Sequence, residues 1–210
     1  MTGLDLSATD QLALDEGCRY DAKAADSAVR WVESNVWINL GSKADRTIPL
    51  MHWQAEFIGR IFGWKRADGT RRYRTAHLSA GKKNGVSTLL LATAAALTRE
   101  SSTPRRPRVR LQASHPGQTA FLERSAWQLY RRNPELARVV AIDSRRRLVS
   151  DRVSGGELRI LSTRAESLDG CHDSAAIIDD LHALSDDRLW ESTRPGLSVR
   201  SEGLGVTAAV

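Results

Sequence analysis

The sequence predicts an α/β domain with a mostly parallel central sheet, flanked by helices and preceded by N-terminal helices. Short apolar runs typical of strands alternate with segments whose apolar residues recur every three to four positions. Such alternation is typical of strand–helix–strand units, which build parallel sheets. With 210 residues, of which 41% are hydrophobic and 27% charged, the chain can form one domain with a substantial core.

Two helices are predicted before the first strand. The first covers residues 20–37 and carries an apolar stripe of Ala25, Val29, Val32 and Val36. The second covers residues 48–64 and carries a stripe of Trp53, Phe57, Ile61 and Trp64. Both stripes have the spacing of one helix face.

Strands and helices alternate after residue 72. The expected strands are apolar runs bounded by turns, at 73–80, 109–114, 174–180 and 204–210, with short strands between 139 and 163 around Ser154-Gly155-Gly156. The expected helices lie at 87–100 and 117–133, and a helical turn lies at 186–195. Residues 81–86 and the basic segment 101–108 are predicted loops.

Composition excludes several classes of protein. Cys18 and Cys171 form neither a metal knuckle nor a disulfide framework, which favours a reduced setting. The N-terminus lacks a signal-peptide pattern, and the longest apolar run is too short to span a bilayer. The net charge of +6 indicates a moderate tendency toward polyanions. Arginines crowd at 105–110 and at 145–147, where they could follow a DNA backbone or form a solvated face.

The stretch "SAGKKNGVSTLLL" at 79–91 has the order of a phosphate-binding loop: strand, glycine-containing loop, Ser-Thr, helix. Small residues let the backbone wrap an anion, and the helix N-terminus adds a favourable partial charge. Ser87 stands where a Mg²⁺-ligating hydroxyl belongs, but Val86 replaces the expected lysine. Lys82 and Lys83 supply cations from the other side of the turn. A plain strand–turn–helix with Ser87 as N-cap would show a similar pattern.

A pair of carboxylates ends the apolar run at 174–180. In P-loop ATPases such a strand presents one carboxylate to Mg²⁺ and another to the attacking water. Asp179 would take the first role and Asp180 the second. A strand followed by a solvated turn has the same local pattern, so the prediction depends on the phosphate loop found about ninety residues earlier.

Four stretches together resemble one family. "PLMHWQAEFIGRIFGW", "LSAGKKNGVSTLLLATAAAL", "ELRILSTRAESLDGCHDSAAIIDDLHAL" and "GVTAAV" are similar, in this order, to motifs of the N-terminal ATPase domain of the tailed-phage terminase large subunit. The resemblance spans roughly residues 20–210. It implies a P-loop NTPase fold, ATP and Mg²⁺ as cofactors, and a motor that packages double-stranded DNA.

The resemblance also implies roles for individual residues. Gln54 matches a glutamine that contacts adenine, and the implied nucleotide-binding loop consists of Gly81, Lys82, Lys83, Asn84, Gly85, Val86, Ser87 and Thr88. Metal binding falls to Ser87 and Asp179, and catalysis to Asp180 with Lys82 and Lys83. The coupling strand corresponds to Thr207 and Ala208, and Gln118 matches a family glutamine of unassigned role.

The sequence departs from the family in three places. Val86 replaces the usual lysine, Asp180 replaces a glutamate, and no nuclease domain follows residue 210. We therefore expect a helical segment at 1–45 and an ATPase domain at 46–210, without nuclease activity. The alternative is an impaired P-loop module that acts in nucleotide binding, DNA binding or assembly.

The family implies a setting as well as an activity. The implied partners are a portal protein, a small terminase subunit and further copies of the chain in a ring, and no membrane is involved. The implied location is the cytoplasm of the infected bacterial host.

Overall fold

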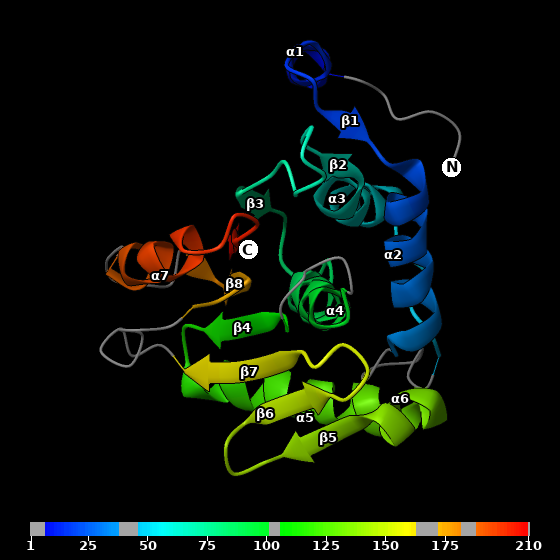
Figure 1. Ribbon diagram of the computed structural model, residues 1–210. Helices are drawn as coiled ribbons and strands as arrows, with labels where there is room; N and C mark the ends of the chain where they lie inside the picture. The colour runs from blue at the N-terminus through cyan, green and yellow to red at the C-terminus, as the bar shows by residue number, and fades with distance from the viewer. Residues whose placement is uncertain (1–6, 38–45, 101–105, 163–171, 182–187, 210) are drawn as a thin grey trace.

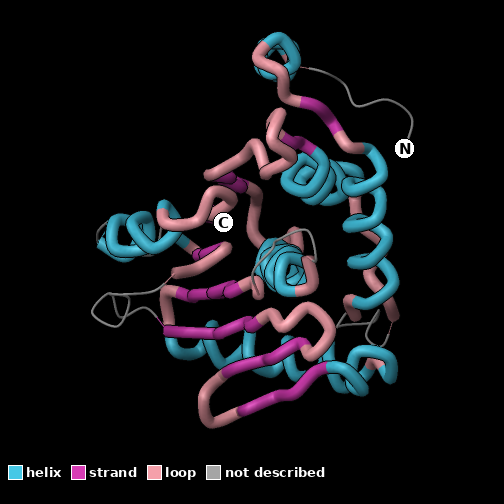
Figure 2. Tube along the Cα trace, viewed as in Figure 1, coloured by secondary structure: helices cyan, strands magenta, loops and turns pink. Residues whose placement is uncertain are grey.

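The computed structural model describes residues 7–37, 46–100, 106–162, 172–181 and 188–209 (Figures 1 and 2). Its helices are α1 (Ala8–Asp15), α2 (Ala22–Asn35), α3 (His52–Gly63), α4 (Val86–Thr98), α5 (Pro116–Arg132), α6 (Pro134–Val139) and α7 (Arg188–Ser198). Its strands are β1 (Arg19–Tyr20), β2 (Trp64–Lys65), β3 (Thr75–Ser79), β4 (Arg108–Ala113), β5 (Val140–Asp143), β6 (Leu148–Asp151), β7 (Glu157–Ser162), β8 (Ala175–Asp179) and β9 (Leu204–Ala209).

Seven strands form the main sheet, in the order β3-β9-β8-β4-β7-β6-β5. Strands β3, β9, β8, β4 and β7 pair in parallel. Strand β6 pairs antiparallel with β7, and β5 pairs antiparallel with β6. The prediction of a mostly parallel sheet is confirmed. Because parallel strands end at one edge of a sheet, the loop after β3, the end of β8 and the turn after β4 meet there.

Helix α4 is enclosed by the rest of the domain (Figure 1). All residues from 89 to 97 are buried, because the helix packs on β4, β7 and β8 and also contacts α2 and α5. Helix α3 packs beside α2 and adds Ile58, Ile61 and Phe62 to the same core. A helix that is apolar on all sides needs such enclosure, so the Leu/Ala composition of α4 determines its central place.

Helix α7 packs on the opposite face of the sheet. Neighbouring residues of β8 divide between the two faces, as expected for a strand: Ile177 belongs to the main core, whereas Ile178 packs with Leu189 and Trp190 of α7. The Trp190 ring lies so close to β9 that a Cβ on Gly205 would come within 2.4 Å of it. Glycine at this position therefore allows the helix to approach the sheet.

Some predicted boundaries were wrong. The helix predicted for 48–64 ends at Gly63, and Trp64 instead begins β2, which pairs antiparallel with β1. Trp64 is fully buried there, with its ring edge-on to Tyr20 at 5.6 Å between centroids. The helical turn predicted near 186–195 is an eleven-residue helix, α7.

Two helices, α1 and α6, were not predicted, although both begin at capping residues. Ser7 and Asp10 form a reciprocal capping box at the start of α1. The side chain of Asn133 accepts hydrogen bonds from the Glu135 and Leu136 N–H groups at the start of α6. Within the described ranges, no helix has both the length and the apolar character needed to cross a membrane.

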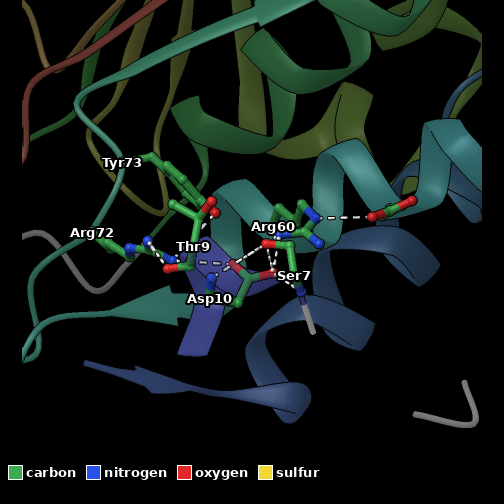
Figure 3. Close-up of polar contacts among 7 residues, drawn as sticks. Ser7, Thr9, Asp10, Arg60, Arg72 and Tyr73 are labelled. Carbon is green, nitrogen blue, oxygen red and sulfur yellow. Dashed lines mark hydrogen bonds and ion pairs between the residues drawn. The ribbon is translucent and has the colours of Figure 1, made fainter. Parts of the chain in front are cut away.

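Helix α1 is fastened to the domain through one buried carboxylate (Figure 3). Asp10 is 1% exposed and accepts hydrogen bonds from Arg60 at 2.9 and 3.0 Å and from Arg72 at 3.3 Å. Arg72 also donates to the Thr9 carbonyl over 3.0 Å and lies 4.8 Å from the centre of the Trp64 ring. Burial alone would raise the pKa of Asp10, but hydrogen bonds from Arg60 and Ser7 hold that pKa below its ordinary value.

Asp10→Asn should lower the free energy of unfolding at neutral pH by about 2 kcal/mol, because Arg60 and Arg72 lose hydrogen bonds to a shared charged group. A carboxyl with a lowered folded pKa stabilises the fold above its unfolded pKa and loses this contribution as pH falls through the folded pKa. The difference between parent and variant should therefore shrink below about pH 4. Urea unfolding across this pH range measures it. Exposed Asp15 in the same helix provides the control Asp15→Asn, and equal curves for parent and Asp10→Asn would contradict the assignment.

Candidate functional site

The loop between β3 and α4 is curled and closed on itself. Asn84 Nδ2 donates to the Gly81 carbonyl over 2.9 Å. Lys83 and Gly85 both adopt left-handed backbone, with φ values of 68° and 76°. That conformation costs a residue with a side chain roughly 1–2 kcal/mol, and such strain is concentrated at functional sites. Left-handed turns of this kind aim successive N–H groups to one side and form an anion-binding concavity.

Val86 and the two loop lysines lie in opposite environments. Val86 is 3% exposed and belongs to the main core, whereas Lys82 and Lys83 are exposed. Val86 is the first residue of α4, so the enclosure of that helix carries its side chain inward. A lysine at this position would have to leave the core or bury its charge. The position where a lysine is usual thus holds a core residue, and the lysines Lys82 and Lys83 lie earlier in the loop.

Gln54 links α3 to this loop. It is 3% exposed; its Nε2 donates to the Asn84 carbonyl over 3.1 Å, and its Oε1 accepts from the Met51 N–H over 3.0 Å. Both ends of the amide are therefore engaged with backbone. The geometry shows Gln54 as a brace for the loop, and a contact with adenine would require one of these bonds to exchange.

Asp179 stands at the end of β8, on the face that carries α4. It is fully buried, and its Oδ2 accepts from Gln118 Nε2 over 2.9 Å. Burial raises the pKa of Asp179; the Ser87 hydroxyl and Gln118 favour the ionised form but do not cancel this effect. Within the described part of the chain, Oδ1 of Asp179 is buried without a well-formed hydrogen bond.

Asp180 shares a donor with Asp179. Its Oδ2 accepts from the same Gln118 Nε2 over 2.6 Å. Its backbone is left-handed, with φ 55°. The structure thus brings together two carboxylates from β8 and one amide from α5, at the edge of the sheet that also carries the loop.

Thr207 and Ala208 lie in β9, between the loop strand β3 and the acidic strand β8. Both are buried. Thr207 is in register with His77 of β3 and Ile178 of β8, and its Oγ1 lies 2.7 Å from His77 Nδ1. A displacement of β9 would therefore shift its hydrogen-bonded neighbours β3 and β8.

The residues present fit a magnesium nucleotide. An orphaned, buried carboxylate oxygen beside a serine hydroxyl is what a hard divalent cation needs. No cluster of three or more His, Cys, Asp or Glu suited to a metal occurs among the described residues.

A hollow of about 480 Å³ opens beside the loop. It is lined by α3 on one side and by the end of β3 and the loop on the other, through Trp53, Glu56, Phe57, Arg60, Leu78, Ser79, Ala80 and Asn84. The volume is in the range of small-molecule sites, and two aromatic side chains offer stacking surfaces.

The two arginine-rich segments differ in exposure. Arg110 is 3% exposed and ion-paired with Asp173, so it is a structural residue and unavailable to DNA. Arg106 and Arg108 are exposed, and Arg105 lies outside the described residues. Residues 145–147 are exposed on the β5–β6 turn.

The loop after β3 leads into a buried helix, and the acidic strand β8 lies two places from β3 in a parallel sheet. This arrangement is typical of the P-loop NTPase class. Within that class, residues 52–209 match the family described as "Terminase large subunit, ATPase domain". The match covers most of the chain, which therefore belongs to this family. The resemblance seen in the sequence is confirmed. No curated protein matches the sequence.

Solved structures agree on the fold. The chain is similar to the HK97 bacteriophage large terminase, with a TM-score of 0.73 and 19% identity over 88% of this chain and 37% of that one. It is also similar to the Thermus phage P74-26 large terminase ATPase domain, with a TM-score of 0.55 and 18% identity over 77% of this chain and 64% of that one. The chain thus spans little more than a third of the HK97 protein.

Sequence reasoning left Gln118 without a role, yet the structure places it at the centre of the acidic pair. The turn after β4 delivers it there, because Ala113 is in register with Asp179 and α5 begins at Pro116. A strand followed by Pro at a helix start and Gln two residues later is the sequence signal. Its partner cannot be identified without the strand order.

Asp179→Asn should stabilise the protein while removing its response to magnesium nucleotide. The folded pKa of Asp179 is raised, so ionisation is disfavoured in the fold and costs stability above that pKa. Without ligand, Tm should rise by roughly 2–4 °C for each kcal/mol recovered. Saturating Mg-ATP should raise the Tm of the parent and leave that of the variant unchanged. Scanning calorimetry with and without Mg-ATP measures both effects. A destabilised variant that still responds to Mg-ATP would refute the site.

Proposed function

We propose that this chain is an ATP-hydrolysing domain of a DNA-packaging terminase, in which Mg-ATP hydrolysis drives duplex DNA into a procapsid. The observation that supports it best is the meeting of the curled loop and the orphaned Asp179 oxygen at one sheet edge. This arrangement joins an anion site to a cation site. A magnesium nucleotide satisfies both at once.

The nucleotide lies along the loop in this proposal. Backbone N–H groups from Gly81 to Thr88 surround the phosphates, where the first N–H groups of α4 have no intrahelical acceptor. Lys82 and Lys83 bring their ammonium groups to the terminal phosphates, since a long flexible stem allows the charge to arrive from a shifted origin. The adenine occupies the hollow beside α3, and Gln54 holds the loop at its border.

The chemistry is an in-line attack of water on the γ-phosphorus. Asp180 orients that water and accepts its proton as the new P–O bond forms and ADP leaves. Ser87 and Asp179 hold Mg²⁺, which when bound neutralises charge on the phosphate oxygens. The lysines stabilise the charge that develops on the leaving oxygens.

The motor function rests on β9 and on partners. Thr207 and Ala208 lie in the strand between loop and acidic pair, where loss of the γ-phosphate moves β9 and the DNA-contacting parts. Exposed arginines at 145–147 give sequence-independent contacts to duplex DNA. The working assembly contains copies of this chain in a ring, a portal protein and a small terminase subunit, in the cytoplasm of an infected bacterium.

A second candidate function is an impaired module that binds nucleotide or DNA without turnover. The burial of Val86 favours it, because the usual lysine is absent and its place is filled by the core. Isothermal titration with a non-hydrolysable ATP analogue and Mg²⁺ measures binding, and a phosphate-release assay with ATP measures turnover; the two measurements together separate the candidates. Tight binding combined with turnover supports the motor domain, and binding without turnover supports the module.

Mg²⁺-dependent ATP hydrolysis, with and without duplex DNA, should depend on the relocated lysines. Lys82→Ala with Lys83→Ala should lower kcat at least about 100-fold, the loss typical when one essential electrostatic contact is removed. The exposed Lys23 provides the control Lys23→Ala, which should match the parent. Val86→Lys should lower Tm without raising turnover, because it disturbs the core. A silent parent that gains turnover through Val86→Lys would show that the lysine was lost and not moved.

A further inference from the structure

The carboxylates of Asp179 and Asp180 lie on the same side of the sheet, although the two residues are consecutive, and both contact Gln118. Consecutive residues of a strand point to opposite faces of a sheet. Asp179 lies on the α4 face, so in extended backbone Asp180 would point toward the face that carries α7. Instead both carboxylates accept hydrogen bonds from one nitrogen of Gln118, at 2.9 and 2.6 Å. The backbone of Asp180 must therefore turn back.

The left-handed backbone of Asp180, φ 55°, provides that turn. The conformation costs about 1–3 kcal/mol and persists only where surrounding contacts hold it. Aspartate tolerates this region better than most residues with side chains. Among the described residues, Gln118 is the one hydrogen-bond donor to the Asp180 carboxylate. This hydrogen bond is therefore the contact that can hold the strained conformation.

The orientation of the Gln118 amide is fixed by chemistry. Ionised carboxylates only accept hydrogen bonds, so the NH₂ end must face them. The amide oxygen on the other end accepts from the Ser114 hydroxyl over 3.3 Å. The NH₂ group has two hydrogens, one for each carboxylate. It thus lies between two like charges that would otherwise repel each other.

We propose that Gln118 is a positioning residue for the hydrolytic water: it holds Asp180 in its strained conformation and aims its carboxylate. This inference rests on the proposed ATPase function and deepens it. Asp179 has the nearby Ser87 hydroxyl as a second polar neighbour. Asp180 has no second donor among the described residues, so loss of Gln118 affects water orientation more than metal binding.

Gln118→Leu tests this role in kinetics, since it keeps the size of the side chain and removes the amide. The kcat for ATP should fall about 10- to 100-fold, as expected for a displaced catalytic group. KM and the affinity for a non-hydrolysable Mg-ATP analogue, measured by titration calorimetry, should stay within about threefold. Gln128→Leu makes the same change at an exposed position of α5 and should match the parent. A kcat within twofold of the parent would overturn the proposal.

A double-mutant cycle tests the contact without any turnover. Gln118→Leu should lower the ratio of folded to unfolded protein about tenfold in the parent and threefold or less in an Asp180→Ala background, because hydrogen bonds to charged groups are coupled. Equal losses in both backgrounds would overturn the positioning role even if the parent is active. If the parent neither binds nor hydrolyses ATP, the proposed function fails, and a coupled cycle would still establish the contact.

Discussion

The enclosure of α4 is the constraint on which the rest of the structure depends. Its Leu and Ala side chains pack against the sheet on one side and against neighbouring helices on others. A helix so enclosed has a fixed axis and a fixed first turn. The loop from β3 must therefore enter at one point and in one direction. Its left-handed residues and its Asn84–Gly81 hydrogen bond follow from that requirement.

The same enclosure explains the replacement of the expected lysine. The first residue of α4 points into the core, and valine satisfies that environment without a charge to solvate. Lys82 and Lys83 stand where the chain is exposed, and in the proposed site the length of their side chains would compensate for the shifted origin of the charge. The charged residues Lys82 and Lys83 and the core residue Val86 are thus at different positions along the loop. In the proposed site, flexible lysine side chains would bring positive charge to the phosphates, whereas α4, Gln54 and the loop backbone would provide the rigid part.

Much of the fold follows from sequence, because periodicity is local. The stripe of Ala25, Val29, Val32 and Val36 and the apolar run before Asp179 indicate a helix and a buried strand without any tertiary information. The capping patterns at Ser7 and Asn133 are equally local and mark the starts of α1 and α6. The position of β9 between β3 and β8 is different in kind, since no local pattern encodes strand order.

The site divides in the same way. The loop and both aspartates are visible as motifs, because their chemistry requires particular residues in sequence. The contacts that position them come from segments far apart in the chain: Gln54 donates to the Asn84 carbonyl, and Gln118 donates to the acidic pair. Each depends on strand order or helix packing. A sequence pattern can therefore name the reacting groups before it can name the residues that hold them.

The most direct test is a crystal structure of this chain with Mg²⁺ and a non-hydrolysable ATP analogue. We expect phosphates in the curl of the loop, an ammonium nitrogen of Lys82 or Lys83 about 2.8 Å from a terminal phosphate oxygen, and Val86 still in the core. A nucleotide bound elsewhere, or bound at the loop with both lysines turned to solvent, would contradict it.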